Sequence, residues 1–282
     1  MNFKQLLQHF KDELNEFYDP QESAAIFNVI ALQVSGLDRG KLHLVQLNEV
    51  SQPELDKYIQ ILKELKTGKP VQYVLGETVF YGLKFKVSEA VLIPRPETEE
   101  LVEWVIGTCS SNFNGRILDI GTGSGCIAVS LMKNLSLSTV FAMDISEAAI
   151  DITIHNAFLN EVVVNSIRAD IRDYSSSEKF DVLVSNPPYI TNDEQPEMHE
   201  NVLAFEPHLA LFVANENPLI FYKAIADFAL TNLNAEGLLF FEINAQFGKE
   251  TVEMLLAKSF IDIELRKDMQ GNDRMIKCRL AG

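Results

Sequence analysis

The sequence has few cysteines, and it has no long apolar run. Its 282 residues include only three cysteines, which are widely spaced and have neither CxxC pairs nor companion histidines, so a disulfide framework or a metal site is not expected. A stretch of about 18 uncharged apolar residues is absent, and the first residues lack the apolar core of a signal peptide. We therefore expect a cytoplasmic protein that binds no membrane and no metal.

Basic residues are also scarce. The chain has 24 Lys and Arg against 40 Asp and Glu, which gives a net charge of -16. Because binding to nucleic acids depends mainly on cationic contacts with phosphates, this charge disfavours direct nucleic-acid binding. The hydrophobic fraction of 47% is sufficient for sizeable cores, and the length is typical of two domains.

Helix signals dominate the amino-terminal part of the chain. Asp19 and Ser51 are each placed as an N-cap, and each is followed by a proline and by a glutamate that can complete a capping box. We expect a helical domain over residues 1–73. Aromatic and β-branched residues then predict a β-hairpin, which we take as a connector over residues 74–93.

Strand-like and helical segments alternate through the rest of the chain. This alternation predicts an α/β domain over residues 94–282, with a doubly wound parallel sheet that carries helices on both faces. Two strands at the end of the chain favour an antiparallel hairpin at the sheet edge. The expected strands span residues 116–120, 140–144, 166–169, 181–185, 238–243, 261–265 and 275–279, and the expected helices span residues 97–106, 124–133, 147–159 and 218–233.

A glycine-rich turn follows the first of these strands. Glycines allow positive φ angles and a close approach of backbone N–H groups to a ligand. A dinucleotide fingerprint would need glycine or alanine at the position of Cys126, whereas an acidic residue two positions before the first glycine is typical of S-adenosylmethionine enzymes. The residues of this turn that we expect to bind a cofactor are Asp119, Gly121, Thr122, Gly123, Ser124 and Gly125.

Carboxylates follow the next two strands. Asp144 ends the second strand, where a carboxylate can accept hydrogen bonds from both hydroxyls of a ribose, a role shared by S-adenosylmethionine and dinucleotide sites. Asp170 follows the third strand and could face the edge of an adenine, although a solvated turn carboxylate is an equal alternative. Both residues are expected in the cofactor site.

The tetrapeptide Asn186–Tyr189, with sequence Asn-Pro-Pro-Tyr, follows a run of apolar residues. Two prolines cannot donate to a β-ladder, so the strand must stop and Asn186 is held at its carboxyl end, where open α/β sheets bind ligands. The Asn186 oxygen, the Pro187 carbonyl and an aromatic ring suit a planar NH2 group. We expect Asn186, Pro187 and Tyr189 to be catalytic, and Pro188 to contact the substrate with them; the alternative is a strand-ending turn.

In this order, the features resemble class I methyltransferases that methylate an exocyclic or amide nitrogen. More narrowly, the chain resembles the HemK/PrmC family of protein-(glutamine-N5) methyltransferases, which act on peptide-chain release factors. The likeness covers nearly the whole chain. It includes the segments Pro70–Gly76, Phe80–Gly82, Val91–Glu99, Glu206–Pro207, Leu209–Leu211 and Lys267–Asp268, with Gly271, Asp273 and Arg274.

This resemblance implies a Rossmann-like class I methyltransferase fold, S-adenosyl-L-methionine as cofactor and S-adenosyl-L-homocysteine as product. It implies that the cofactor lies over the glycine turn, that Asn186 borders it, and that Asn186 and Pro187 hold a substrate glutamine. It also implies that residues 93–96 border the cofactor. Ile171 belongs to this site, but it stands where some relatives have an aromatic residue for adenine stacking. The implied partners are class I release factors, methylated in their Gly-Gly-Gln motif by a monomeric enzyme.

Other functions remain open from the sequence. An N6-adenine nucleic-acid methyltransferase would use the same tetrapeptide, because adenine presents the same two N–H donors. Glutamine methylation of a ribosomal protein is a closer alternative, since discrimination would lie in the helical domain. A nicotinamide-dependent dehydrogenase is disfavoured by Cys126, and a noncatalytic adaptor by the intact turn and Asn186.

Overall fold

The computed structural model describes residues 1–110 and 112–281 and divides the chain into two compact units. The first unit, here called the helical unit, consists of Met1–Gly76 together with His199–Phe205. The second, here called the sheet unit, consists of Glu77–Met198 and the chain from Glu206 onward. No helix of the described residues is long and apolar enough to cross a membrane.

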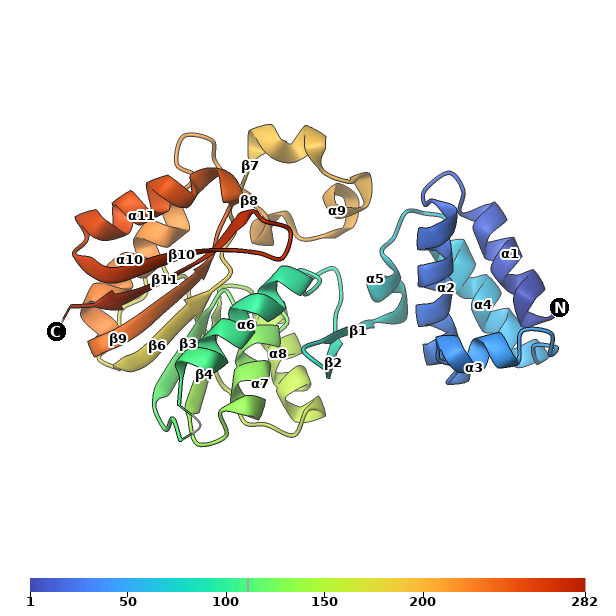
Figure 1. Ribbon diagram of the computed structural model, residues 1–282, viewed down its shortest axis with the longest axis horizontal. Helices are drawn as coiled ribbons and strands as arrows, with labels where there is room; N and C mark the ends of the chain where they lie inside the picture. Colours follow the sequence, from blue (N-terminus) through green and yellow to red (C-terminus); the bar gives the residue numbers. More distant parts are fainter. Residues whose placement is uncertain (111, 282) are drawn as a thin grey trace. The chain divides into compact units, whose positions relative to one another are not determined.

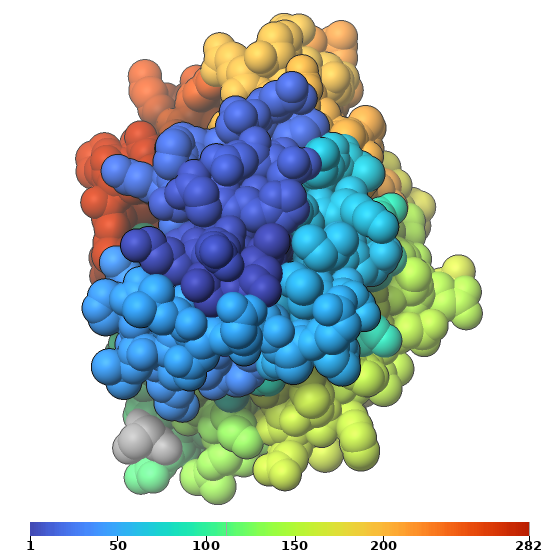
Figure 2. All heavy atoms as spheres, turned by 90° about the vertical axis from the view of Figure 1, so that its right-hand side faces the viewer, coloured from blue at the N-terminus to red at the C-terminus, as the bar shows by residue number. Residues whose placement is uncertain are grey.

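The helical unit is built around an aromatic core. The rings of Phe10 and Phe27 meet edge to face at 5.2 Å between centroids, and Phe27 stacks on Tyr58 at 5.6 Å. All three side chains are fully buried, as expected for a small bundle that depends on large apolar residues for stability. Figure 2 shows the outer surface of these helices. They are α1 (Phe3–Glu13), α2 (Pro20–Ser35), α3 (Arg39–Leu44), α4 (Gln52–Leu65) and α5 (Val71–Leu75).

The two predicted N-caps differ in the structure. Asp19 caps α2 as expected, because its carboxylate accepts the backbone N–H groups of Gln21 and Glu22. The predicted capping box at Ser51 is wrong. Ser51 is the N-cap residue of α4, but its side chain accepts no cap hydrogen bond and instead donates its hydroxyl to Glu54.

A short helix from the later part of the chain completes the helical unit. This helix, α9 (Glu200–Phe205), lies in the sequence between segments of the sheet unit. Asn201 Nδ2 donates to the hydroxyl of Tyr18 at 2.9 Å, and a Cβ atom at Gly68 would lie 3.8 Å from the Phe205 ring. Such long-range packing leaves no local pattern in the sequence. The domains predicted from the sequence, with bounds at residues 73 and 93, therefore did not assign this helix to the helical domain.

The sheet unit contains a seven-stranded sheet in the order β10-β11-β9-β6-β3-β4-β5. The strands β3, β4, β5, β6 and β9 run parallel, whereas β11 pairs antiparallel with β9 and β10 pairs antiparallel with β11. The predicted doubly wound sheet and its terminal hairpin are therefore confirmed. The bounds are β3 (Arg116–Ile120), β4 (Thr139–Asp144), β5 (Asn165–Arg168), β6 (Phe180–Ser185), β9 (Leu233–Glu242), β10 (Phe260–Lys267) and β11 (Asp273–Leu280).

Helices cover both faces of this sheet (Figure 1). One core contains the apolar side chains of α6 (Pro96–Thr108), α7 (Cys126–Asn134) and α8 (Glu147–Leu159), and the other contains those of α10 (Ile220–Asn232) and α11 (Gly248–Ala257). The helix α11 was not predicted from the sequence. Between β3 and β6 the chain order reverses direction, which is the point where doubly wound sheets bind ligands.

The remaining elements are short. The predicted hairpin is formed by β1 (Glu77–Phe80) and β2 (Leu83–Lys86), and it starts later than expected because residues 71–75 are helical. Asn156 of α8 anchors it, accepting from the Lys86 N–H at 2.7 Å and donating to the Lys86 carbonyl at 2.9 Å. A two-stranded pair, β7 (Ile190–Thr191) with β8 (Phe212–Val213), and the 3-10 helices η1 (Asn192–Glu197), η2 (His208–Ala210) and η3 (Ala245–Phe247) complete the unit.

Candidate active site

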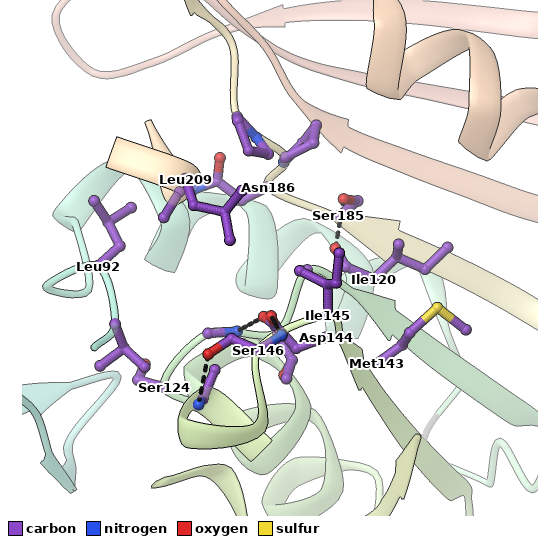
Figure 3. A pocket seen from close by; sticks show the side chains of 18 of the residues that line it. Leu92, Ile120, Ser124, Met143, Asp144, Ile145, Ser146, Ser185, Asn186 and Leu209 are labelled. Carbon is purple, nitrogen blue, oxygen red and sulfur yellow. Dashed lines mark hydrogen bonds between the residues drawn. The ribbon is translucent and has the colours of Figure 1, made fainter. Parts of the chain in front are cut away.

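A cavity of about 360 Å³ lies at the carboxyl ends of β3, β4 and β6. This volume is within the range of small-molecule sites. In Figure 3, Asn186 and Leu209 lie on one side of the cavity, and Asp144, Ser146 and Ser124 lie on the other. The predicted site residues that line it are Gly121, Thr122, Gly123, Ser124, Asp144, Asp170, Ile171, Asn186, Pro187 and Pro188. The lining does not include Asp119, Gly125 or Tyr189.

The three glycines of the turn after β3 have different roles in the structure. All have positive φ, but a Cβ atom at Gly121 or Gly123 would meet nothing within 4 Å, so these two present open backbone to the cavity. A Cβ atom at Gly125 would lie 2.9 Å from Thr153 Cγ2. Gly125 is therefore needed for the close packing of the turn against α8, and the other two leave room for a ligand.

Asp119 lies beneath the turn, fully buried. Its Oδ2 accepts the Thr122 hydroxyl at 2.6 Å and the Ala128 N–H at 3.2 Å, which ties the turn to the first residues of α7. Its Oδ1 has no hydrogen-bond partner among the described residues. Burial, with the nearby Asp144 charge, raises the pKa of Asp119 to about 7.

Asp144 ends β4 at the edge of the cavity. Its Oδ2 accepts the Gly123 N–H at 2.9 Å and its Oδ1 accepts the Ser146 N–H at 2.9 Å, which fixes the carboxylate between the turn and the start of α8 (Figure 3). Burial raises the pKa of Asp144, although the same N–H groups oppose the shift. Because each oxygen has a further lone pair, the carboxylate can still accept two ligand hydroxyls.

Asp170 also lines the cavity, but Arg172 occupies its carboxylate. The Arg172 Nε lies 2.9 Å from Oδ1, and Nη2 lies 2.5 Å from Oδ2. These hydrogen bonds hold the pKa of Asp170 below its usual range. The Arg172 guanidinium lies 5.7 Å from the centre of the Phe221 ring, which also lines the cavity. An aromatic side chain is thus present near Ile171, contributed by α10.

Asn186 is half-buried at the end of β6. Its Nδ2 donates to the Thr98 hydroxyl oxygen at 3.2 Å, which leaves its Oδ1 for a ligand. The preceding Ser185 donates its hydroxyl to the Ile120 carbonyl at 2.6 Å, tying the ends of β6 and β3 together (Figure 3). Tyr189 turns away from the cavity, and its hydroxyl donates to the buried Glu242 at 3.1 Å.

An ion pair between the half-buried Arg95 and the buried Glu206 links two segments that border the cavity. Arg95 Nη2 lies 2.6 Å from Glu206 Oε1, and the Ile93 N–H donates to Glu206 Oε2 at 3.2 Å. Pro94 precedes this arginine and Pro207 follows this glutamate, and both line the cavity. No group of His, Cys, Asp and Glu side chains suited to a metal ion occurs among the described residues.

Comparison with known proteins gives matches over both units. Residues 101–206 match the Methyltransferase small domain family, and residues 5–76 match the PrmC N-terminal domain family. The release factor glutamine methyltransferase of Flavobacterium psychrophilum is 47% identical, with 98% of this chain and 99% of that protein covered. The chain belongs to the release factor glutamine methyltransferase family.

A second relative supports this family, and a solved structure supports the fold. The release factor glutamine methyltransferase of Bacteroides thetaiotaomicron is 39% identical, with 95% of this chain and 96% of that protein covered. A crystal structure of a methyltransferase from Pyrococcus furiosus has a TM-score of 0.53 and 16% identity, covering 72% of this chain and 92% of that one. At this identity the second likeness shows the fold alone, and it confirms a class I methyltransferase sheet.

Sequence reasoning missed several residues that line the cavity of this family member, namely Ser146, Phe221 and Thr98, and one that lies behind Thr98, Glu242. Ser146 and Phe221 line it, but neither stands in a motif, because α8 and α10 reach the cavity only through the fold. Thr98 stands within a segment that carried the resemblance, yet its contact with Asn186 spans 88 residues of sequence. Glu242 ends β9, and its position after a buried strand was the one local signal that could have indicated it.

Proposed function

We propose that the chain methylates the side-chain amide nitrogen (N5) of the glutamine in the Gly-Gly-Gln motif of class I release factors, with S-adenosyl-L-methionine as methyl donor. The observation that carries this proposal is Asn186, which lies across the cavity from Asp144 and whose hydrogen bond to Thr98 uses its amide nitrogen and not its oxygen. Family membership supports the same reaction. Release factors work on cytoplasmic ribosomes, so the proposal includes a cytoplasmic enzyme, which we expect to act as a monomer.

The cavity residues fit S-adenosylmethionine. Gly121 and Gly123 leave open space beside the turn, and Asp144 supplies a carboxylate at the end of the neighbouring strand for the ribose hydroxyls. Asp170, Ile171 and Phe221 would border the adenine, with Phe221 in place of the aromatic residue absent at Ile171. When bound, the cofactor supplies an electrophilic methyl group on a sulfonium.

The proposed role of Asn186 and Pro187 is to position the acceptor nitrogen. A carboxamide nitrogen is a poor nucleophile because its lone pair is delocalised into the carbonyl group. If Asn186 Oδ1 and the Pro187 carbonyl accept its two N–H bonds, they fix the nitrogen and direct its lone pair toward the methyl group. Neutral acceptors are sufficient here, since the proton leaves after the methylated nitrogen has become acidic.

The same two acceptors would select glutamine over glutamate. A glutamate carboxylate has no N–H to donate to these two acceptors. Its oxygens would instead face the Asn186 and Pro187 oxygens, which is unfavourable. Tyr189 contributes indirectly in this proposal, because its bond to Glu242 anchors the end of the tetrapeptide.

The test is to incubate the protein with isotope-labelled S-adenosylmethionine and a purified class I release factor, and to locate the label by mass spectrometry of peptides. We expect one methyl group on the glutamine of the Gly-Gly-Gln motif. Parallel reactions contain the Gln→Glu variant of that motif, ribosomal proteins, and single-stranded DNA. Label on a ribosomal-protein glutamine or on adenine, with an unlabelled release factor, would replace the proposal by one of the alternatives.

A further inference from the structure

A chain of buried hydrogen bonds runs from Asn186 into the interior of the sheet unit. Asn186 Nδ2 donates to Thr98 Oγ1 at 3.2 Å, and the Thr98 hydroxyl donates to Glu242 Oε2 at 2.7 Å. Thr98 and Glu242 are 2% and 1% exposed. The three residues come from the end of β6, the first turn of α6 and the end of β9, so the chain is assembled only by the fold.

The polarity of this chain follows from the number of protons. A hydroxyl has one proton, and Thr98 gives its proton to the Glu242 carboxyl group. Toward Asn186, Thr98 Oγ1 can then act only as a hydrogen-bond acceptor, so Asn186 must offer it an N–H donor. Asn186, which lines the cavity, must therefore turn its NH2 group toward Thr98 and its oxygen away from it. The opposite orientation would bring two oxygens together in a buried site.

The same carboxyl group holds the other end of the tetrapeptide. The Tyr189 hydroxyl donates to Glu242 Oε1 at 3.1 Å, and Asn244 Nδ2 donates to the Tyr189 carbonyl at 3.1 Å. A proton on Oε1 would reverse the Tyr189 bond but leave Oε2 as an acceptor for Thr98. The bond from Thr98 therefore keeps its direction as long as Oε2 carries no proton.

We infer that Glu242 and Thr98 are positioning residues, which hold the Asn186 amide in the orientation that receives an N–H donor from the substrate. The inference rests on the proposed function, because the orientation matters only for a substrate nitrogen bound by Asn186 Oδ1. Neither residue needs to touch the reacting atoms. Removing the Thr98 hydroxyl frees the amide to rotate, so that most molecules no longer hold the oxygen in the geometry that receives the substrate N–H.

The decisive variant is Thr98→Val, which keeps the shape of the side chain and removes its hydroxyl. We expect kcat for the release factor to fall by about 10- to 100-fold, the usual effect of losing a group that orients a ligand-contacting residue. The KM for the release factor and the Kd for S-adenosylmethionine should stay unchanged. Thr98→Ser keeps the hydroxyl and should restore most of kcat.

Thr251→Val is the matched control. Thr251 is also fully buried, and its hydroxyl donates to the Phe247 carbonyl at 2.7 Å, away from the cavity residues. The Thr251→Val variant also loses one buried threonine hydroxyl, but at a site away from the cavity. We therefore expect it to lower the stability and to leave kcat unchanged. If Thr98→Val does not fold, Thr98→Ala is measured instead, with calorimetric binding of S-adenosylmethionine as evidence of an intact site.

A second readout concerns selectivity. The release factor with Gln→Glu in its motif should inhibit the wild-type enzyme poorly, and it should inhibit Thr98→Val more strongly, because a rotated amide offers N–H donors to the carboxylate. A wild-type kcat in Thr98→Val, no rescue by serine, or an equal loss in Thr251→Val would overturn the inference. An inactive wild-type enzyme would instead refute the proposed function.

Discussion

The Asn186 oxygen is the residue-scale feature on which the proposed reaction depends. The side chain is held through its nitrogen by Thr98, so its loss removes an acceptor without removing a buried packing group. We predict that Asn186→Ala lowers kcat/KM by roughly 10² or more, as for the removal of one oriented hydrogen-bonding group in other active sites. Steady-state kinetics with the release factor test this. Near-normal turnover by a folded variant that binds S-adenosylmethionine would contradict the mechanism.

Asp119 gives a residue-scale prediction about pH. Burial raises its pKa from 3.8 to about 7 in the folded protein. Because of this raised pKa, the folded protein keeps a proton on Asp119 that the unfolded chain has lost. The contribution of Asp119 to the free energy of unfolding is therefore complete below a pH of about 4, and it is lost as the pH rises through about 7. We predict that the free energy of unfolding of the wild type, relative to Asp119→Asn, falls by roughly 2–3 kcal/mol between pH 5 and pH 8.

Urea unfolding of both proteins without cofactor, at the two pH values, measures this difference. The comparison with the variant removes the contribution of all other titrating groups. An unchanged difference would mean that Asp119 is ionised in the folded state at pH 5, stabilised by the Thr122 hydroxyl and the Ala128 N–H.

At the scale of elements, the turn between β3 and α7 combines a packing requirement with a binding requirement. We predict that Gly125→Ala lowers the stability of the ligand-free protein by about 2 kcal/mol or more, because it adds a contact with Thr153 to the strain of positive φ. Gly121→Ala meets no neighbour and should cost about 1 kcal/mol, yet it should weaken cofactor binding.

Thermal unfolding and calorimetric titration with S-adenosylmethionine separate the two effects. Each variant is the control for the other, since both place a Cβ at positive φ. If Gly125→Ala and Gly121→Ala lose the same stability, Thr153 must move to accommodate the added methyl group. If Gly121→Ala binds S-adenosylmethionine as tightly as Gly125→Ala does, Gly121 does not belong to the cofactor site.

The elements that the sequence predicted are those with strong local patterns. The strand at residues 116–120 and the helix at residues 147–159 were predicted at their observed bounds, because both stand out in the alternation of strand-like and helical segments. The helix α11 was missed because it begins at Gly248 after a 3-10 turn, without a side-chain cap. Ser51 was misread because Glu54 competes for its hydroxyl.

The residues of the candidate site, like the helices and strands, were predictable where a local sequence pattern marks them. Asp144 and Asn186 stand directly at or after the ends of buried strands, so their shared position at one edge of the sheet follows from parallel pairing. Thr98 and Glu242 were not predictable, because their hydrogen bond joins residues 144 positions apart. The arginine that neutralises Asp170 is two residues away, but only the fold decides whether it faces that carboxylate or solvent.

At the scale of the whole molecule, the two units offer separate surfaces for the cofactor and for the protein substrate. All residues that line the cavity belong to the sheet unit, so the helical unit is available for recognition of the protein substrate. A glutamine on a loop needs contacts beyond the cavity to be distinguished from other glutamines. Leu44 and Leu47 are candidates, because they lie three residues apart on the helical unit and are 83% and 71% exposed.

We predict that the double variant Leu44→Ser and Leu47→Ser raises the KM for the release factor by roughly tenfold, since two apolar side chains lose their burial against the partner. The kcat and the Kd for S-adenosylmethionine should not change, because the cavity is in the other unit. The matched control is Phe158→Ser with Val163→Ser, two side chains of the sheet unit that are 84% and 77% exposed. An unchanged KM in the first variant, or an equal rise in the control, would place the docking surface elsewhere.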